Sequence, residues 1–136
     1  MNEFVASISG LDDFVAYFAM ALALVAVFLR VYTWVTPYRE IALIREGNVA
    51  AALSLSGALL GFVIPLASAI AHSVAWWDML FWGAVALVVQ LLWYFAVRLI
   101  VPKLSQDIPA GKVAQGLFLG AGSLAVGILN AASLTY

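Results

Sequence analysis

Four long apolar runs constrain this chain more than any other feature. They cover residues 14–35, 48–71, 79–101 and 113–134 of the 136-residue sequence. As helices, such runs would each be about 33 to 36 Å long, enough to cross a hydrocarbon core of about 30 Å with modest tilt. Charged residues make up only 10% of the chain, whereas a soluble domain carries roughly a quarter. The sequence therefore predicts an all-α integral membrane protein with four transmembrane helices, in a single membrane domain over residues 1–136.

The sequence contains few residues or motifs that would support catalysis, metal binding or cofactor binding. The net charge is −1 and cysteine is absent, so we expect no nucleic-acid partner, no disulfide and no thiolate metal site. The run 120–125 resembles a dinucleotide fingerprint, but it lies inside an apolar span without a preceding strand. Zinc-helix motifs, nucleophile elbows and phosphate loops are missing. We expect no catalytic residue, no cofactor and no metal, and therefore no enzyme.

The basic residues predict the orientation, because cytoplasmic loops and helix ends accumulate Lys and Arg. All of them flank the first and third connections: Arg30, Arg39, Arg45, Arg98, Lys103 and Lys112. The opposite side holds Glu3, Asp12, Asp13 and Asp78. We therefore expect both termini in the periplasm. The segment before the first apolar run has no basic residue, unlike a cleaved signal peptide, so we expect the first helix to be retained.

The first connection, residues 36–47, predicts a short helix at the membrane surface. Thr36 is a candidate N-cap, Pro37 fits a first helical position, and Gly47 fits a C-terminal stop. The apolar side chains Ile41, Leu43 and Ile44 would face the headgroups. The charged side chains would stay in water: Arg39, Glu40, Arg45 and Glu46. The third connection, residues 102–112, again begins with proline and has Gly111 near its end.

An internal repeat appears when the chain is shifted by about 64 positions against itself. Matches without a gap include Ile44 with Ile108, Gly47 with Gly111, and Val49-Ala50 with Val113-Ala114. They predict two helix-loop-helix repeats, residues 14–71 and 79–134, with the same orientation and related by a pseudo-twofold axis along the membrane normal. The alternative is a chance match of Ala, Gly and Leu.

Small residues form stripes on the second and fourth spans at spacings of three and four. The glycines of these stripes are Gly57, Gly61, Gly116, Gly120 and Gly127. They predict a close helix-packing interface, although such stripes could also expose backbone toward a narrow pathway. The first and third spans instead carry bulky residues that we expect to face lipid: Phe18, Phe28, Trp34, Phe81, Trp82, Trp93, Tyr94 and Phe95.

Polar residues inside the spans are candidates for interhelix hydrogen bonds or for a polar path, because unsatisfied polar groups are costly in hydrocarbon. They are Gln90, Asn130, Ser54 and Ser123. Gln90 lies near the predicted midplane, where its amide needs a partner on another helix. Pro65 frees the carbonyl of Gly61 and predicts a kink. Arg30 and Arg98 lie near the helix ends and are expected to reach the phosphates.

Several short motifs together resemble a known family. They include Thr-Pro-Tyr at 36–38, Glu-Gly-Asn-Val-Ala-Ala-Ala at 46–52, Gly-Ala-Leu-Leu-Gly at 57–61, and Asn-Ala-Ala-Ser at 130–133. On these residues the chain resembles the YjfL-like family of small bacterial inner-membrane proteins, domain of unknown function 350. The resemblance covers nearly the whole chain. It implies a bacterial inner-membrane location and supplies no activity or catalytic residues.

Two classes of function fit these observations. The first is a homo-oligomeric channel-like or transport-related assembly, since four helices seldom enclose a path alone. The second is a non-conducting scaffold or partner subunit of an envelope stress system. The expected partners are the lipid bilayer, further copies of the chain and other membrane proteins.

Overall fold

The computed structural model describes residues 2–72 and 75–134, which are helical except for short connections. The four long helices are α1 (Asn2–Val35), α3 (Val49–His72), α4 (Trp76–Ile100) and α6 (Val113–Ser133). Two short helices, α2 (Glu40–Arg45) and α5 (Leu104–Asp107), lie in the connections. No strand occurs in these ranges, and all four long helices are long and apolar enough to cross a membrane. The all-α membrane fold is confirmed. The predicted single domain also includes positions 1, 73–74 and 135–136, which lie outside the described residues.

The helix ends agree with the predicted spans except at α1. This helix begins at Asn2 and has 34 residues, which makes it about 51 Å long. The apolar run alone located the start of the first span at residue 14, but the residues before it continue the same helix because none of them is a proline. A helix of this length exceeds the hydrocarbon thickness unless it is strongly tilted.

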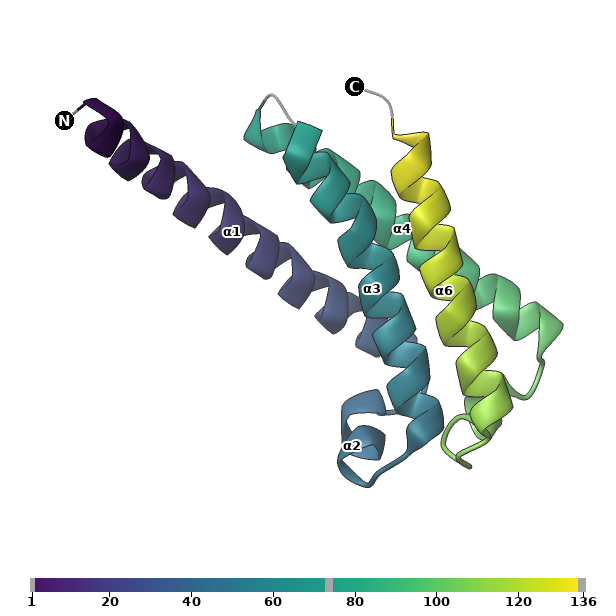
Figure 1. Cartoon of the computed structure of the whole chain (residues 1–136). Coiled ribbons are helices and arrows are strands. Elements are labelled where there is room, and N and C mark those ends of the chain that lie inside the picture. The colour runs from purple at the N-terminus through teal and green to yellow at the C-terminus, as the bar shows by residue number, and fades with distance from the viewer. Residues whose placement is uncertain (1, 73–74, 135–136) are drawn as a thin grey trace.

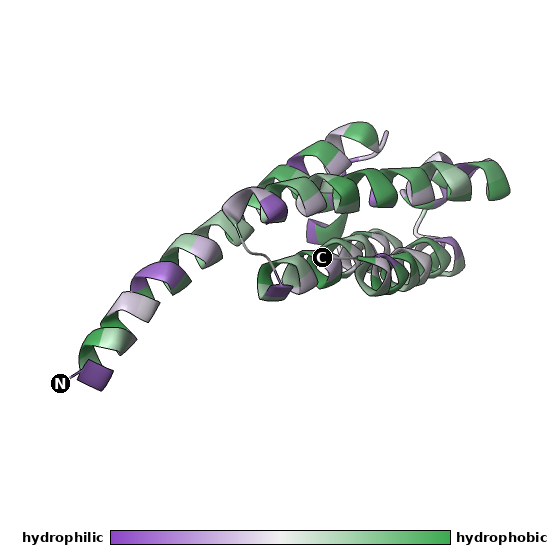
Figure 2. Ribbon diagram, turned by 90° about the horizontal axis from the view of Figure 1, so that it is seen from above, coloured by the Kyte–Doolittle hydropathy of each residue, from purple (hydrophilic) through white to green (hydrophobic). Residues whose placement is uncertain are grey.

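The start of α1 and the end of α6 lie at one end of the bundle, and α2 and α5 lie at the other (Figure 1). We call the latter the connection end. Helices α3 and α6 run parallel and side by side, and α4 packs against both. The N-terminal half of α1 lies apart from the other helices in both views (Figures 1 and 2). Apolar residues line the long helices on most sides (Figure 2), as lipid contact requires.

The core forms where α1, α3 and α4 meet. The rings of Phe28 and Phe62 stack with centroids 4.4 Å apart, and Tyr32 packs against Tyr94 edge-on at 6.0 Å. Phe28 and Tyr94 are fully buried, so their predicted lipid-facing positions are wrong. They occupy the inner face of their helices, which the aromatic content of a span does not reveal. Trp34 and Phe81, at 83% and 61% exposure, do lie on the outer surface.

The two connections end in the same capping motif. The Gly47 N–H donates to the Ile44 carbonyl at 2.9 Å, and the Asn48 N–H donates to Leu43 at 2.9 Å. The Gly111 and Lys112 N–H groups make the corresponding bonds to Ile108 at 3.0 Å and Asp107 at 3.1 Å. Both glycines have positive φ, 86° and 79°, which glycine adopts without strain. The predicted stop at Gly47 is therefore confirmed, and Gly111 forms the same motif near the end of the third connection.

The predicted repeat stays a prediction. The capping motifs match at a shift of 64 positions, and α3 and α6 are parallel. Helices α1 and α4 differ, however: α4 packs on both α3 and α6, whereas the two buried residues of α1, Phe28 and Tyr32, lie in its last third.

Candidate functional site

Helices α3 and α6 meet along a seam in which their backbones touch. A β carbon at Gly116 would overlap the Ala50 backbone, and one at Gly120 would overlap the Leu53 carbonyl. Further along, a β carbon at Gly57 would overlap the Gly120 backbone, and one at Gly127 would overlap that of Gly61. We call this contact the α3–α6 seam. All five candidate packing glycines are buried in it: Gly57, Gly61, Gly116, Gly120 and Gly127.

The seam has a polar centre. Gln90 of α4 is fully buried, and its Nε2 donates to the Ser123 carbonyl oxygen at 3.0 Å. The Gln90 Oε1 and Ser123 Oγ atoms are buried without a hydrogen-bond partner among the described residues. The structure thus brings Gln90 and Ser123 together across two helices. A glutamine amide carries two N–H donors and an acceptor oxygen, and one of these donors is the group that has a partner here.

The other two candidate polar residues lie elsewhere. The Ser54 hydroxyl donates to the Ala51 carbonyl of its own helix at 3.0 Å. Asn130 lies two turns beyond Ser123, with a buried Nδ2 that has no partner among the described residues. The four candidate residues therefore do not form one continuous polar path within the chain.

A second hydrogen bond between α4 and α6 escaped the sequence analysis. The indole N–H of Trp93 donates to the Leu119 carbonyl oxygen at 3.1 Å. Its ring occupies the space that a side chain at residue 122 would fill, because a β carbon at Gly122 would overlap it. Trp93 is half-buried, so its expected lipid-facing position needs correction. Gly122 was the available signal, since it lies outside the stripe of the other glycines.

Helix α3 continues through Pro65. The Gly61 carbonyl that Pro65 leaves without its helical donor lies against Gly127 of α6. The glycine backbone of the neighbouring helix, rather than a polar side chain, therefore covers this oxygen.

We expect Gln90→Leu to change the free energy of unfolding by less than about 1 kcal/mol. The substitution removes the bond to Ser123 together with the unpaired Oε1 atom, and interhelical hydrogen bonds in membranes average about 0.6 kcal/mol. Denaturant unfolding of the purified protein in detergent, followed by tryptophan fluorescence, measures this change. A loss above about 3 kcal/mol would mean that Gln90 supports a larger network than the bond to Ser123.

Glu40 lies buried at the connection end, which contradicts its predicted exposure to water. Helix α2 begins at Glu40 with Arg39 as its N-cap, so the predicted start at Thr36 and Pro37 is also wrong. The Thr36 hydroxyl instead donates to Glu40 Oε1 at 2.6 Å. Burial raises the pKa of Glu40 from 4.5 to about 6. Tyr38, two residues before Glu40, is also buried.

The basic residues at the connection end remain exposed: Arg30, Arg39, Arg45, Arg98, Lys103 and Lys112. Lys112 pairs with Asp107 at 3.3 Å, and the Arg98 guanidinium lies 5.9 Å from the ring centroid of Tyr94. Their positions in the helices place all six toward the same end of the bundle.

These features define a class: an all-helical multipass membrane protein whose buried polar residues lie along the α3–α6 seam and at the connection end. The model of the family described as Domain of Unknown Function (DUF350) matches residues 6–134. The chain therefore belongs to this family, which confirms the resemblance drawn from its motifs.

Two relatives extend the comparison. The UPF0719 inner membrane protein YjfL of Escherichia coli K12 is 47% identical over 123 residues, which cover 90% of this chain and 93% of that protein. The UPF0719 transmembrane protein YshE of Bacillus subtilis is 29% identical over 97 residues, covering 71% of this chain and 72% of that protein. No solved structure matches the chain.

Proposed function

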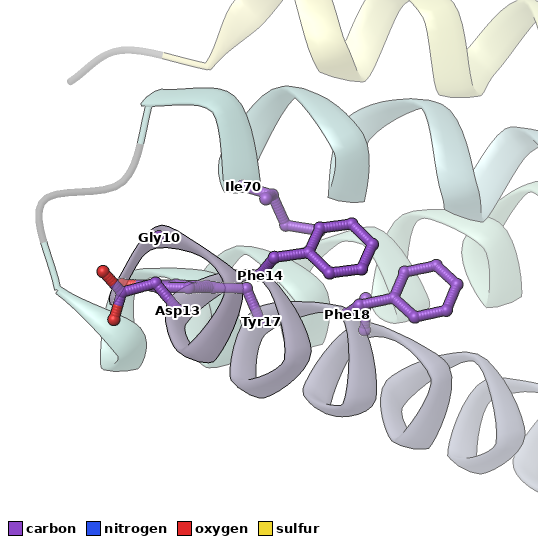
Figure 3. A pocket seen from close by; sticks show the side chains of 7 residues that line it. Gly10, Asp13, Phe14, Tyr17, Phe18 and Ile70 are labelled. Carbon is purple, nitrogen blue, oxygen red and sulfur yellow. The ribbon is translucent and has the colours of Figure 1, made fainter. Parts of the chain in front are cut away.

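We propose that this chain forms homo-oligomers in the bacterial inner membrane and serves as a channel-like, transport-related assembly without enzymatic activity. The supporting observation is the open wedge between α1 and α3. An apolar groove of about 420 Å³ lies there, lined by one face of α1 from Gly10 to Ala21 and by Ile70 of α3. Figure 3 shows Phe14 and Phe18 beside Ile70 in this groove.

The residues that line this groove between α1 and α3, which we also call the wedge, favour a helix from a second copy of the chain as the occupant. Its wall contains Gly10, the carboxylate-bearing Asp13 and the hydroxyl-bearing Tyr17, besides the phenylalanines. Small and polar residues are typical of helix–helix contacts in membranes, whereas lipid tails offer no partner to a carboxylate. A neighbouring helix in the groove would complete the packing of α1.

A solute path in such an assembly would run between protomers. The α3–α6 seam has backbone-to-backbone contact along its glycines, which leaves no room for a water path in the seam. The same observation favours the second candidate function, a non-conducting scaffold. Flux assays in liposomes separate the two: the transport proposal requires Na⁺, K⁺ or small-solute flux above that of empty liposomes, and the scaffold requires co-purifying partners without flux.

The proposed orientation has both termini in the periplasm and the connection end in the cytoplasm, because all six basic residues flank the connections. An alkaline phosphatase fused to the C-terminus should be active in whole cells. An inactive phosphatase together with an active cytoplasmic reporter at the same position would reverse the orientation.

Gly10→Leu tests the occupant of the wedge. In the single chain a β carbon at Gly10 meets nothing within 4 Å, so a leucine there disturbs only a second molecule. We expect the oligomer to dissociate at least about tenfold more readily, which corresponds to about 1.4 kcal/mol. Native mass spectrometry from detergent across a dilution series measures this change.

Ala23→Leu is the matched control. Ala23 is an exposed residue of the same helix, on the face opposite the groove at 100° per residue, so its leucine variant should assemble like the wild type. A monomeric wild-type protein, or equal assembly of both variants, would contradict a helix in the wedge.

A further inference from the structure

Buried oxygen atoms from α1, α2, α4 and the connection before α2 lie close together at the connection end. Three tyrosines are near enough to Glu40 to interact with it electrostatically: Tyr32 in α1, Tyr38 in the connection and Tyr94 in α4. Each is at most 6% exposed, and Glu40 is 1% exposed. The pKa of Glu40 is raised by this burial. We call Thr36, Glu40 and the three tyrosines the Glu40 cluster.

Most polar atoms of the Glu40 cluster have no partner. Among the described residues, Glu40 Oε2 and the hydroxyl oxygens of Tyr32, Tyr38 and Tyr94 are buried without a well-formed hydrogen bond, although the Tyr94 side chain lies close to Tyr38 and Arg98. Only Glu40 Oε1 is satisfied, by the Thr36 hydroxyl. Native proteins leave few buried polar groups unpaired, and several together indicate a bound water or ion.

The charge of Glu40 also lacks a counterion. With a pKa of about 6, the carboxyl group is mostly ionised at neutral pH, and a buried charge is costly unless it is paired. Arg98 is the basic residue that contacts the cluster: its exposed side chain lies over the Tyr94 ring and its charge reaches Tyr38 and Tyr94, but no interaction between Arg98 and Glu40 is seen. The nearest pairing seen in the structure is thus with a hydroxyl group, not with a cation.

We propose that the Glu40 cluster binds a monovalent alkali cation, Na⁺ or K⁺, with Glu40 Oε2 as its anionic ligand and the tyrosine hydroxyl oxygens as neutral ligands. These are hard oxygen donors, which suit alkali and alkaline-earth ions rather than soft metals. A single carboxylate favours the monovalent class, because Ca²⁺ sites draw on several carboxylates. In the part of the chain that the structure describes, no three His, Cys, Asp or Glu side chains gather to hold a metal ion.

The bound cation would join three elements that the chain otherwise holds together weakly here. Helix α2 is only six residues long, and Thr36–Glu40 is the side-chain hydrogen bond that fixes its first turn. A cation between Glu40, Tyr32 and Tyr94 would connect α2 to α1 and α4. This inference concerns one chain and does not depend on the proposed oligomer or on transport.

Thermal unfolding of the purified protein in detergent tests the proposal. The midpoint is measured by circular dichroism in choline chloride, NaCl, KCl and a low concentration of CaCl₂, at matched ionic strength. We expect a saturable rise of about 3 to 6 °C in NaCl or KCl over choline chloride. Equal midpoints in choline, Na⁺ and K⁺ would overturn the proposal and leave water as the occupant. A stronger response to Ca²⁺ would overturn the monovalent class.

Two variants locate the effect. Glu40→Gln should abolish the difference between salts, whereas Glu46→Gln, which changes an exposed carboxylate of the same connection, should preserve it. A salt response that survives in Glu40→Gln would place the cation elsewhere. If Glu40→Gln does not fold, Tyr38→Phe replaces it: removal of one hydroxyl ligand should weaken the apparent affinity at least about fivefold, and an unchanged affinity would overturn the proposal.

Discussion

Gly120→Ala is expected to cost about 3 kcal/mol of the free energy of unfolding. The added β carbon would overlap the carbonyl oxygen of Leu53 in the facing helix. Overpacking usually costs 1 to 3 kcal/mol. The upper end applies here because the obstacle is helix backbone, which cannot rotate away as a side chain does. Helices α3 and α6 would have to separate, and the contact of Gly57 with the Gly120 backbone would loosen as well.

Gly83→Ala is the matched control for the seam. It also lies in a buried helix position, but its β carbon would meet only the Leu24 side chain at 3.5 Å and that of Leu66 at 3.7 Å, which is ordinary contact. We expect no loss and a gain of up to about 1 kcal/mol from helix propensity. Denaturant titration in detergent, followed by circular dichroism, compares the two proteins. Equal stability of Gly120→Ala and Gly83→Ala would contradict the close backbone contact between α3 and α6 at Gly120.

Thr36→Val is expected to cost about 2 kcal/mol at neutral pH. Valine has nearly the shape of threonine but removes the donor to the buried Glu40 carboxylate at 2.6 Å, and hydrogen bonds to charged groups contribute about 1.5 to 3 kcal/mol. The Thr36 hydroxyl also lowers the pKa of Glu40, so its loss should raise that pKa further above about 6. The deficit should therefore be largest above pH 7 and shrink as the pH falls below about 6, where the carboxyl of the folded state is mostly protonated in both proteins.

Thr33→Val supplies the control for this pair. The Thr33 hydroxyl donates to the Leu29 carbonyl of its own helix at 2.7 Å, an oxygen that the helix already uses, so its removal should change stability by less than about 0.5 kcal/mol. Unfolding of both variants at pH 4 and pH 7.5 in detergent tests the difference. If the stability loss of Thr36→Val did not depend on pH, the loss would not come from the interaction of Thr36 with the ionised Glu40 carboxylate.

The candidate seam was predictable from sequence because glycine spacing is a local property. The glycine spacing predicts one face on each of two helices that packs closely against another helix. These glycines are Gly57 and Gly61 on the first, and Gly116, Gly120 and Gly127 on the second. The sequence could not show that these faces meet each other, or that Trp93 fills the space beside Gly122. Both depend on how far the helices are rotated about their axes, and that rotation is decided by packing across three helices at once.

The Glu40 cluster was not predictable because charge and proximity to a loop favour exposure. Glu40 follows Arg39 in a connection with four charged residues, and such residues usually remain in water. Its burial depends on Tyr32 and Tyr94, which are 62 positions apart in the chain and meet only through the packing of α1 on α4. No local pattern connects these residues.

The sequence by itself determined the membrane class, the four helices, and the stop at Gly47. The physical reason is that a bilayer accepts only long apolar segments with satisfied backbones, and that a left-handed cap requires glycine. Tertiary structure alone decided which aromatic rings are buried, which polar atoms meet, and that the N-terminal half of α1 stands apart from the bundle. Every face of these helices is apolar enough to contact lipid, so hydropathy does not show which face is buried. Side-chain packing and hydrogen bonds between helices decide which face is buried.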